Sequence, residues 1–169
     1  MIGDASTFSA YAWGVQLFEA LPVGIRRVCY RVAHRLLRVY WFVIRPTTDG
    51  AKCLLTIGDQ VLLVRHTYGE GEWDLPGGTI RRGEPPADAA RREMHEELGV
   101  MIDDWTSLGR IDGRVHHHPN RLHCFHAELD HDTLVFDHGE IAAGGWFPRD
   151  RLPAGTGAYA RQIIGLLHS

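Results

Sequence analysis

Cysteine is scarce in this chain of 169 residues, and the three cysteines, Cys29, Cys53 and Cys124, lie far apart without a CxxC pair. This count and spacing argue against a disulfide framework and against a zinc ribbon. A long apolar run is also missing: residues 5–25, the most apolar early stretch, include a glutamate and a proline, and no basic cluster precedes them as in a signal peptide. The sequence therefore predicts a cytoplasmic protein without a transmembrane segment.

An excess of either charge is missing as well, because 18 Lys and Arg face 21 Asp and Glu, for a formal net charge of -3. With 44% hydrophobic residues, the chain is neither a disordered protein nor a strongly basic nucleic-acid binder, so DNA is not expected as a partner. Lysine itself is nearly absent, since Lys52 is the single lysine beside seventeen arginines. The length fits one domain with an extension.

Acidic residues are missing from residues 20–48, which carry six of the arginines. Apolar residues recur there at spacings of three and four, which predicts a basic amphipathic helix that starts at Pro22 and ends at Pro46. Such a helix packs on its own domain, on a second subunit or on an anionic membrane surface, and the sequence leaves these alternatives open. We expect a helical extension over residues 1–45, and a homodimer with this helix as its candidate interface.

Beyond Pro46 the pattern changes to that of strands mixed with helices. Two apolar runs flank Gly58 and Asp59, a two-residue hairpin signal. The expected strands cover residues 51–57, 60–66, 102–112, 121–129 and 140–147, and the expected helices cover 85–98 and 156–168. This mixture predicts an α+β or layered α/β/α domain over residues 46–169.

Three carboxylates share one face of the helix expected at 85–98. At about 100° per residue, Glu93, Glu96 and Glu97 fall within an arc of about 100°. Like charges at this spacing repel by about 0.2–0.5 kcal/mol per pair in water. A divalent cation such as Mg²⁺ or Mn²⁺ offsets that repulsion, because it prefers carboxylate and carbonyl oxygens and bridges to substrate phosphates. The alternative is a solvated acidic face paired with the neighbouring arginines.

The segment from Gly78 to Val100 resembles the signature box of the Nudix hydrolase superfamily, Gly-x5-Glu-x7-Arg-Glu-U-x-Glu-Glu-x-Gly-U, where U is a bulky apolar residue. Every fixed position is present, namely Gly78, Glu84, Arg92, Glu93, Met94, Glu96, Glu97, Gly99 and Val100. The sequence WDLPGG before the box and EIAAGGWFPRDRLP after it also resemble the family. The resemblance covers about residues 46 to 168.

The resemblance implies an α/β/α sandwich with a mixed β-sheet, and hydrolysis of a diphosphate by water attack on phosphorus with Mg²⁺ or Mn²⁺ as cofactor. The metal ligands that it implies are three carboxylates and a backbone carbonyl: Glu93, Glu96, Glu97, and Gly77 or Gly78. It gives Glu84 and Arg92 the task of holding loop and helix together. Gly99 suits the end of the helix.

The general base and the substrate contacts are less defined. The base is open between Glu93 and Glu140, which is expected on the strand before Trp146. Arg65 is a candidate phosphate contact, with a surface salt bridge as the equal alternative. Arg114 and His116 belong to a polar segment, residues 114–121, which the resemblance implies is a variable substrate-contacting loop; a plain solvated loop is the alternative.

The resemblance implies a small nucleotide compound as substrate: a nucleoside diphosphate linked to another moiety, such as a nucleoside triphosphate or a nucleotide sugar. Motifs that mark particular substrates in the family are missing, so the substrate stays open. A catalytically silent Nudix-fold nucleotide sensor or interaction module is the alternative, and the complete set of box carboxylates favours the enzyme. Isopentenyl diphosphate isomerase is a third possibility, but its upstream cysteine context is not found around Cys53.

Overall fold

The computed structural model describes residues 22–44, 48–69, 71–115 and 118–168, and within them five strands form one mixed sheet. The strands are β1 (Thr48–Ile57), β2 (Gln60–His66), β3 (Thr106–Val115), β4 (His118–Glu128) and β5 (Ile141–Pro148). Their spatial order is β3-β4-β1-β2-β5, with β1 parallel to β4 and the other neighbouring pairs antiparallel. The expected mixed sheet is therefore confirmed.

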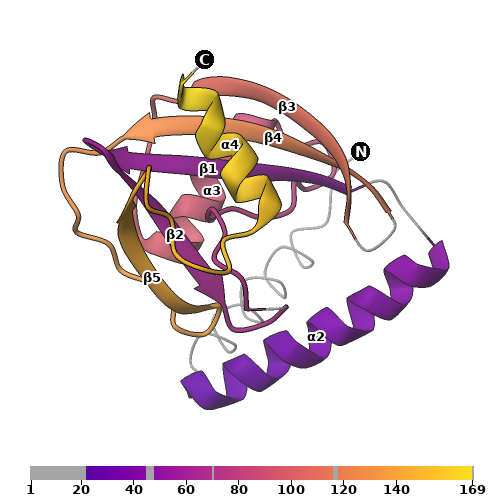
Figure 1. Ribbon diagram of the computed structural model, residues 1–169. Coiled ribbons are helices and arrows are strands. Elements are labelled where there is room, and N and C mark those ends of the chain that lie inside the picture. The colour runs from indigo at the N-terminus through magenta and orange to yellow at the C-terminus, as the bar shows by residue number, and fades with distance from the viewer. Residues whose placement is uncertain (1–21, 45–47, 70, 116–117, 169) are drawn as a thin grey trace, which may run out of the picture.

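Two helices cover opposite faces of this sheet, so the structure has three layers (Figure 1). The described helices are α2 (Val23–Ile44), α3 (Pro86–Leu98), α4 (Ala158–Gly165) and the short 3₁₀ helix η1 (Leu166–His168). Adjacent residues of a strand point to opposite faces. On β1, Leu55 accordingly packs in the core with Met94 of α3, whereas Leu54 packs with Ile163 of α4. This arrangement confirms the α/β/α sandwich.

The ends of α3 are determined by local sequence. Pro85 has an extended backbone just before the helix, and Pro86 takes the first helical position, where its missing N–H is not needed. At the other end Gly99 has φ 67°, a left-handed conformation that favours glycine, and its N–H donates to the carbonyl of His95 at 3.1 Å. These two ends fix which residues α3 presents to the sheet.

The N-terminal half of α2 packs on its own domain. The Arg26 guanidinium lies 3.1 Å from the Asp137 carboxylate. Arg27 Nε donates to the carbonyl of His138 at 3.0 Å, and Arg31 Nε donates to the carbonyl of Thr67 at 3.4 Å. Of the alternatives for this helix, the described contacts support packing on its own domain.

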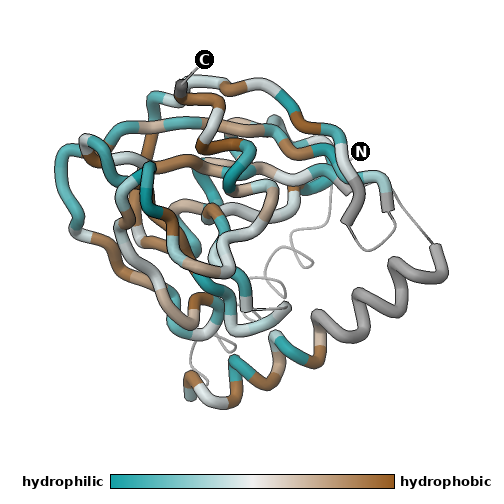
Figure 2. The backbone as a smooth tube through the Cα atoms, in the orientation of Figure 1, coloured by the Kyte–Doolittle hydropathy of each residue, from teal (hydrophilic) through white to brown (hydrophobic). Residues whose placement is uncertain are grey.

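The opposite face of α2 is apolar and open to solvent. Ile25, Val28 and Val32 are 49%, 56% and 49% exposed, and the first turns of the helix alternate between hydrophobic and hydrophilic residues in Figure 2. None of the helices in the described ranges is long and apolar enough to cross a membrane. The homodimer through this helix stays a prediction.

The prediction of a loop over residues 114–121 is wrong for most of this segment, which lies in strands. β3 runs through Arg114 to Val115, and β4 already begins at His118, so that Arg114 pairs with Pro119 and Val115 pairs with His118. The described pairing of β4 with β1 starts only at Asn120, so Pro119 lies outside it and its missing N–H removes no bond there. The polar composition indicated a loop, but pairing between neighbouring strands decided the structure.

The single lysine of the chain joins the segment before α3 to the sheet. Lys52 Nζ on β1 lies 2.7 Å from Asp74 Oδ2 and donates to the carbonyl of Leu75 at 2.9 Å. Burial raises the pKa of Asp74, but the charge and hydrogen bond of Lys52 outweigh it and hold that pKa below its ordinary value. The pair therefore fixes the start of the loop that leads to Gly77.

This pair predicts a defined pH dependence of stability. Because the pKa of Asp74 is lower in the folded protein, the unfolded chain takes up a proton first, at about pH 3.9. The contribution of Asp74 is thus fully present above about pH 4 and is lost as the pH falls through its folded pKa. We expect Asp74→Asn to lower the free energy of unfolding at pH 7, and the difference from wild type to shrink below pH 4. Urea denaturation from pH 7 to pH 3 measures it, and a difference that does not change with pH would contradict the assignment.

Candidate active site

The three carboxylates of α3 lie on one helix face but in different surroundings. Glu97 is buried, with 1% of its surface exposed. The side chain of Glu93 is 12% exposed and that of Glu96 is 47% exposed. The carboxylates therefore form a gradient from the protein interior to solvent.

A glycine turn lies directly against two of these carboxylates. The N–H of Gly77 donates to Glu97 Oε2 at 3.0 Å. A Cβ at Gly78 would lie 2.5 to 2.6 Å from the carboxyl atoms of Glu93, and Gly77, with φ 128°, packs so closely on the carbonyl of Ala51 that a Cβ would overlap it. The Gly78 carbonyl already accepts a hydrogen bond from Ala51 N–H at 2.9 Å, so the Gly77 carbonyl is the better candidate for a metal ligand. The turn can approach the carboxylates only because both residues lack side chains.

Arg92 connects the loop before α3 with the helix. Its Nε and Nη2 donate to the two oxygens of Glu84 at 2.8 and 2.9 Å, and its Nη1 donates to Glu93 at 2.5 Å and to Glu96 at 3.1 Å. Nη2 also donates to the carbonyl of Thr79 at 3.1 Å. The hydrogen bonds from Arg92 lower the pKa of Glu84 to about 2. Glu84 and Arg92 thus make the loop-to-helix contact that the sequence predicts.

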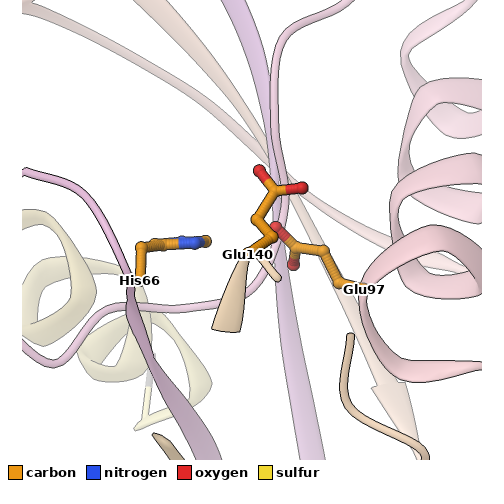
Figure 3. A group of neighbouring side chains, drawn as sticks. All are labelled: His66, Glu97 and Glu140. Atoms are coloured by element: carbon orange, nitrogen blue, oxygen red, sulfur yellow. The ribbon is translucent and has the colours of Figure 1, made fainter. Parts of the chain in front are cut away.

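Glu140 reaches the same site from the β5 edge of the sheet. It lies in the turn directly before β5, not on the strand, because β5 begins at Ile141. The hydroxyl of Tyr68 donates to Glu140 Oε1 at 2.6 Å. Atoms that can bind a metal in His66, Glu97 and Glu140 all lie within 4.8 Å of one another, and Figure 3 shows the three side chains converging. The predicted Glu140 and the buried Glu97 are therefore brought together.

Sequence reasoning missed His66 and Tyr68. The His66 ring stacks on the Tyr68 ring with centroids 5.0 Å apart. A signal was available in the strand alternation of β2, because Leu62 and Val64 face the α3 core and His66 follows at the same parity. The sequence instead favours the neighbouring Arg65 as a candidate phosphate contact.

Arg65 is not brought to the carboxylates. Its guanidinium carbon lies 4.6 Å from the centroid of the Trp73 ring, a cation–π contact with a residue that packs on the α4 side of the sheet. Arg114 is described by its backbone alone, at the end of β3, and His116 lies outside the described residues. The substrate contacts expected from these three residues stay predictions.

Helix α2 borders this cluster. The Tyr30 ring of α2 lies 6.3 Å from the Tyr68 ring, centroid to centroid. Burial, with the charges of Glu140 and Asp137 nearby, raises the pKa of Tyr30 to about 12. Helix α2 therefore contributes the Tyr30 ring next to Tyr68, the residue that holds Glu140.

The electrostatics of the buried carboxylates favour a bound proton or a bound cation. Burial raises the pKa of Glu97 well above its ordinary value, and the charge of Glu140 raises it further. The hydrogen bond from the Gly77 N–H lowers this pKa but does not offset the two larger effects. Burial also raises the pKa of Glu93 and of Glu140. A bound divalent cation would favour the charged forms of all three and would bind oxygen donors. These residues therefore fit a divalent metal ion.

A NUDIX domain family model matches residues 46–165, and the chain therefore belongs to the Nudix family. The chain is 31% identical over 99 residues to the putative ADP-ribose pyrophosphatase YjhB of Bacillus subtilis (strain 168), covering 56% of this chain and 47% of that protein. It is 32% identical over 88 residues to the oxidized purine nucleoside triphosphate hydrolase of Mus musculus, covering 51% of this chain and 55% of that protein. The chain thus spans about half the length of these curated relatives.

The fold is similar to the crystal structure of a MutT NUDIX hydrolase from Burkholderia pseudomallei, with a TM-score of 0.67 and 24% sequence identity. That similarity covers 72% of this chain and 98% of the other. Helix α2 precedes the residues that the family model matches.

Proposed function

We propose that this chain is a metal-dependent pyrophosphohydrolase that cleaves a nucleoside diphosphate linked to another moiety by water attack on phosphorus. The observation that carries the proposal is the burial of Glu97, 1% exposed, against a glycine turn and within 4.8 Å of Glu140. A buried carboxylate next to a second one is unfavourable unless a cation or a proton compensates it. A solvated acidic face, the alternative for these residues, would not bury Glu97.

The ligands would come from the inner end of the carboxylate gradient. Glu93, Glu97 and the Gly77 carbonyl would hold Mg²⁺ or Mn²⁺. Glu96, which accepts hydrogen bonds from Arg81 and Arg92, would be the metal ligand on the solvent side. The bound ion supplies charge neutralisation on the phosphate oxygens and lowers the pKa of water. Arg92 keeps Glu93 and the loop in fixed geometry, so the oxygens need little rearrangement when the ion binds.

Glu140 is our candidate for the general base. Glu93 Oε1 already accepts a hydrogen bond from Arg92, and the Glu93 carboxyl packs against Gly78. Glu140 has one oxygen held by Tyr68, which orients the carboxylate and leaves the other oxygen to accept a proton from the attacking water. Burial raises the pKa of Glu140, and a carboxylate with a raised pKa is a stronger base.

A substrate panel tests this function. We expect release of a nucleoside monophosphate or of pyrophosphate from at least one of ADP-ribose, oxidised purine nucleoside triphosphates and nucleotide sugars, and only with Mg²⁺ or Mn²⁺ present. Products are resolved by anion-exchange chromatography, with a metal chelator as control. Binding of these compounds without turnover under any metal would instead support the nucleotide sensor.

A further inference from the structure

We infer that His66 supplies an imidazole nitrogen to the cation held at Glu97, and that this site therefore prefers Mn²⁺ and later transition metals to Mg²⁺. The inference rests on the proposed function, because it concerns the same site. It goes beyond the carboxylates of the box and the Gly77 carbonyl, since His66 comes from the end of β2.

Geometry places the imidazole in the site. A ring nitrogen of His66 lies within 4.8 Å of a carboxylate oxygen of Glu97 and of Glu140. In Figure 3 the ring points from β2 toward both carboxylates. Donor atoms this close come within reach of one ion after small side-chain rotations, and Glu97, buried on α3, is the fixed partner.

The position of His66 is fixed by two neighbours. The Tyr68 ring stacks on the imidazole at 5.0 Å, with an interplanar angle of 23°. The register between β2 and β5 shifts between Arg65 and His66, after which His66 pairs with Ile141, the residue that follows Glu140. A bulge of this kind re-aims a side chain next to a site. The same pairing therefore brings both the imidazole and Glu140 to the metal ligands.

The chemical consequence is selectivity among metals. Mg²⁺ takes oxygen donors and holds its waters, whereas affinity for a nitrogen donor rises along the first-row series from Mn²⁺ through Co²⁺ to Cu²⁺. A site with oxygen donors alone only weakly favours transition metals over Mg²⁺. One nitrogen in the ligand set shifts the preference toward the transition metals.

Electron spin echo spectroscopy of Mn²⁺ bound to the full chain tests the ligand directly. We expect nitrogen modulation in the wild type and its loss in His66→Gln, which keeps a polar side chain of similar reach. His95→Gln is the matched control, because His95 is exposed on α3 and lies on the side opposite the carboxylates. Calorimetric titration should show that His66→Gln lowers Mn²⁺ affinity about tenfold and Mg²⁺ affinity less than about threefold.

The outcomes separate the two proposals. Mn²⁺ bound at wild-type affinity without nitrogen modulation, or modulation that survives in His66→Gln, would overturn the assignment of His66 and leave the hydrolase proposal standing. Mn²⁺ binding that is unaffected by Glu97→Gln, or absent from the wild type, would overturn the metal site of the proposed function itself.

Discussion

Glu97→Gln is expected to lower kcat by about 100- to 1000-fold without unfolding the protein. Glutamine has the shape of glutamate and keeps an oxygen that accepts the Gly77 N–H, but it removes the negative charge that would hold the cation. Steady-state kinetics with the best substrate and saturating Mg²⁺ measure the loss. Unchanged turnover would reject Glu97 as a metal ligand.

The melting temperature of the same variant separates catalysis from folding. Without metal, Glu97→Gln should melt at the wild-type temperature or above it, because it removes a buried charge that faces Glu140 and Glu93. Mn²⁺ should raise the melting temperature of the wild type and not that of the variant. Glu128→Gln, at the exposed last residue of β4, is the control, and it should behave as wild type in both measurements.

Arg92→Ala is expected to lower the free energy of unfolding by about 3 kcal/mol. Its guanidinium side chain is 16% exposed and serves Glu84, Glu93 and Glu96, so alanine leaves several acceptors without their donor. Urea denaturation analysed by linear extrapolation gives the difference. Arg92→Lys should recover only part of it, since one ammonium cannot make the two parallel bonds to Glu84.

Arg91→Ala provides the matched control for Arg92. Arg91 is the preceding residue of α3 and also makes two ion pairs, but its partners Asp88 and Asp103 have side chains that are 56% and 83% exposed. Ion pairs of this kind contribute about 0–1 kcal/mol. Equal destabilisation by the two substitutions would show that Arg92 is an ordinary surface arginine and not the connection between loop and helix.

The sequence could predict the local part of the site. Helical spacing alone places Glu93, Glu96 and Glu97 on one face, and Gly99 marks the end of α3. The hairpin at Gly58 was also predictable, because a two-residue turn is read directly from neighbouring residues. These features depend on contacts between residues close in the chain.

The rest of the site depends on pairing between distant strands. His66 and Tyr68 meet Glu140 because β2 lies beside β5, and no periodicity within either segment states which strands are neighbours. The helical pattern of α2 likewise predicted a helix but not its partner. Two of its arginines bind backbone carbonyls, those of His138 and Thr67, and a carbonyl is present at every residue.

The glycine turn leaves no room for a side chain between position 78 and the Glu93 carboxylate. An alanine at position 78 would place its methyl carbon 2.5 Å from the carboxyl carbon of Glu93, so the carboxylate would have to leave its place. The sheet and both covering helices would remain, because Gly78 lies outside them. One methyl group at position 78 would therefore displace a proposed metal ligand while leaving the scaffold intact.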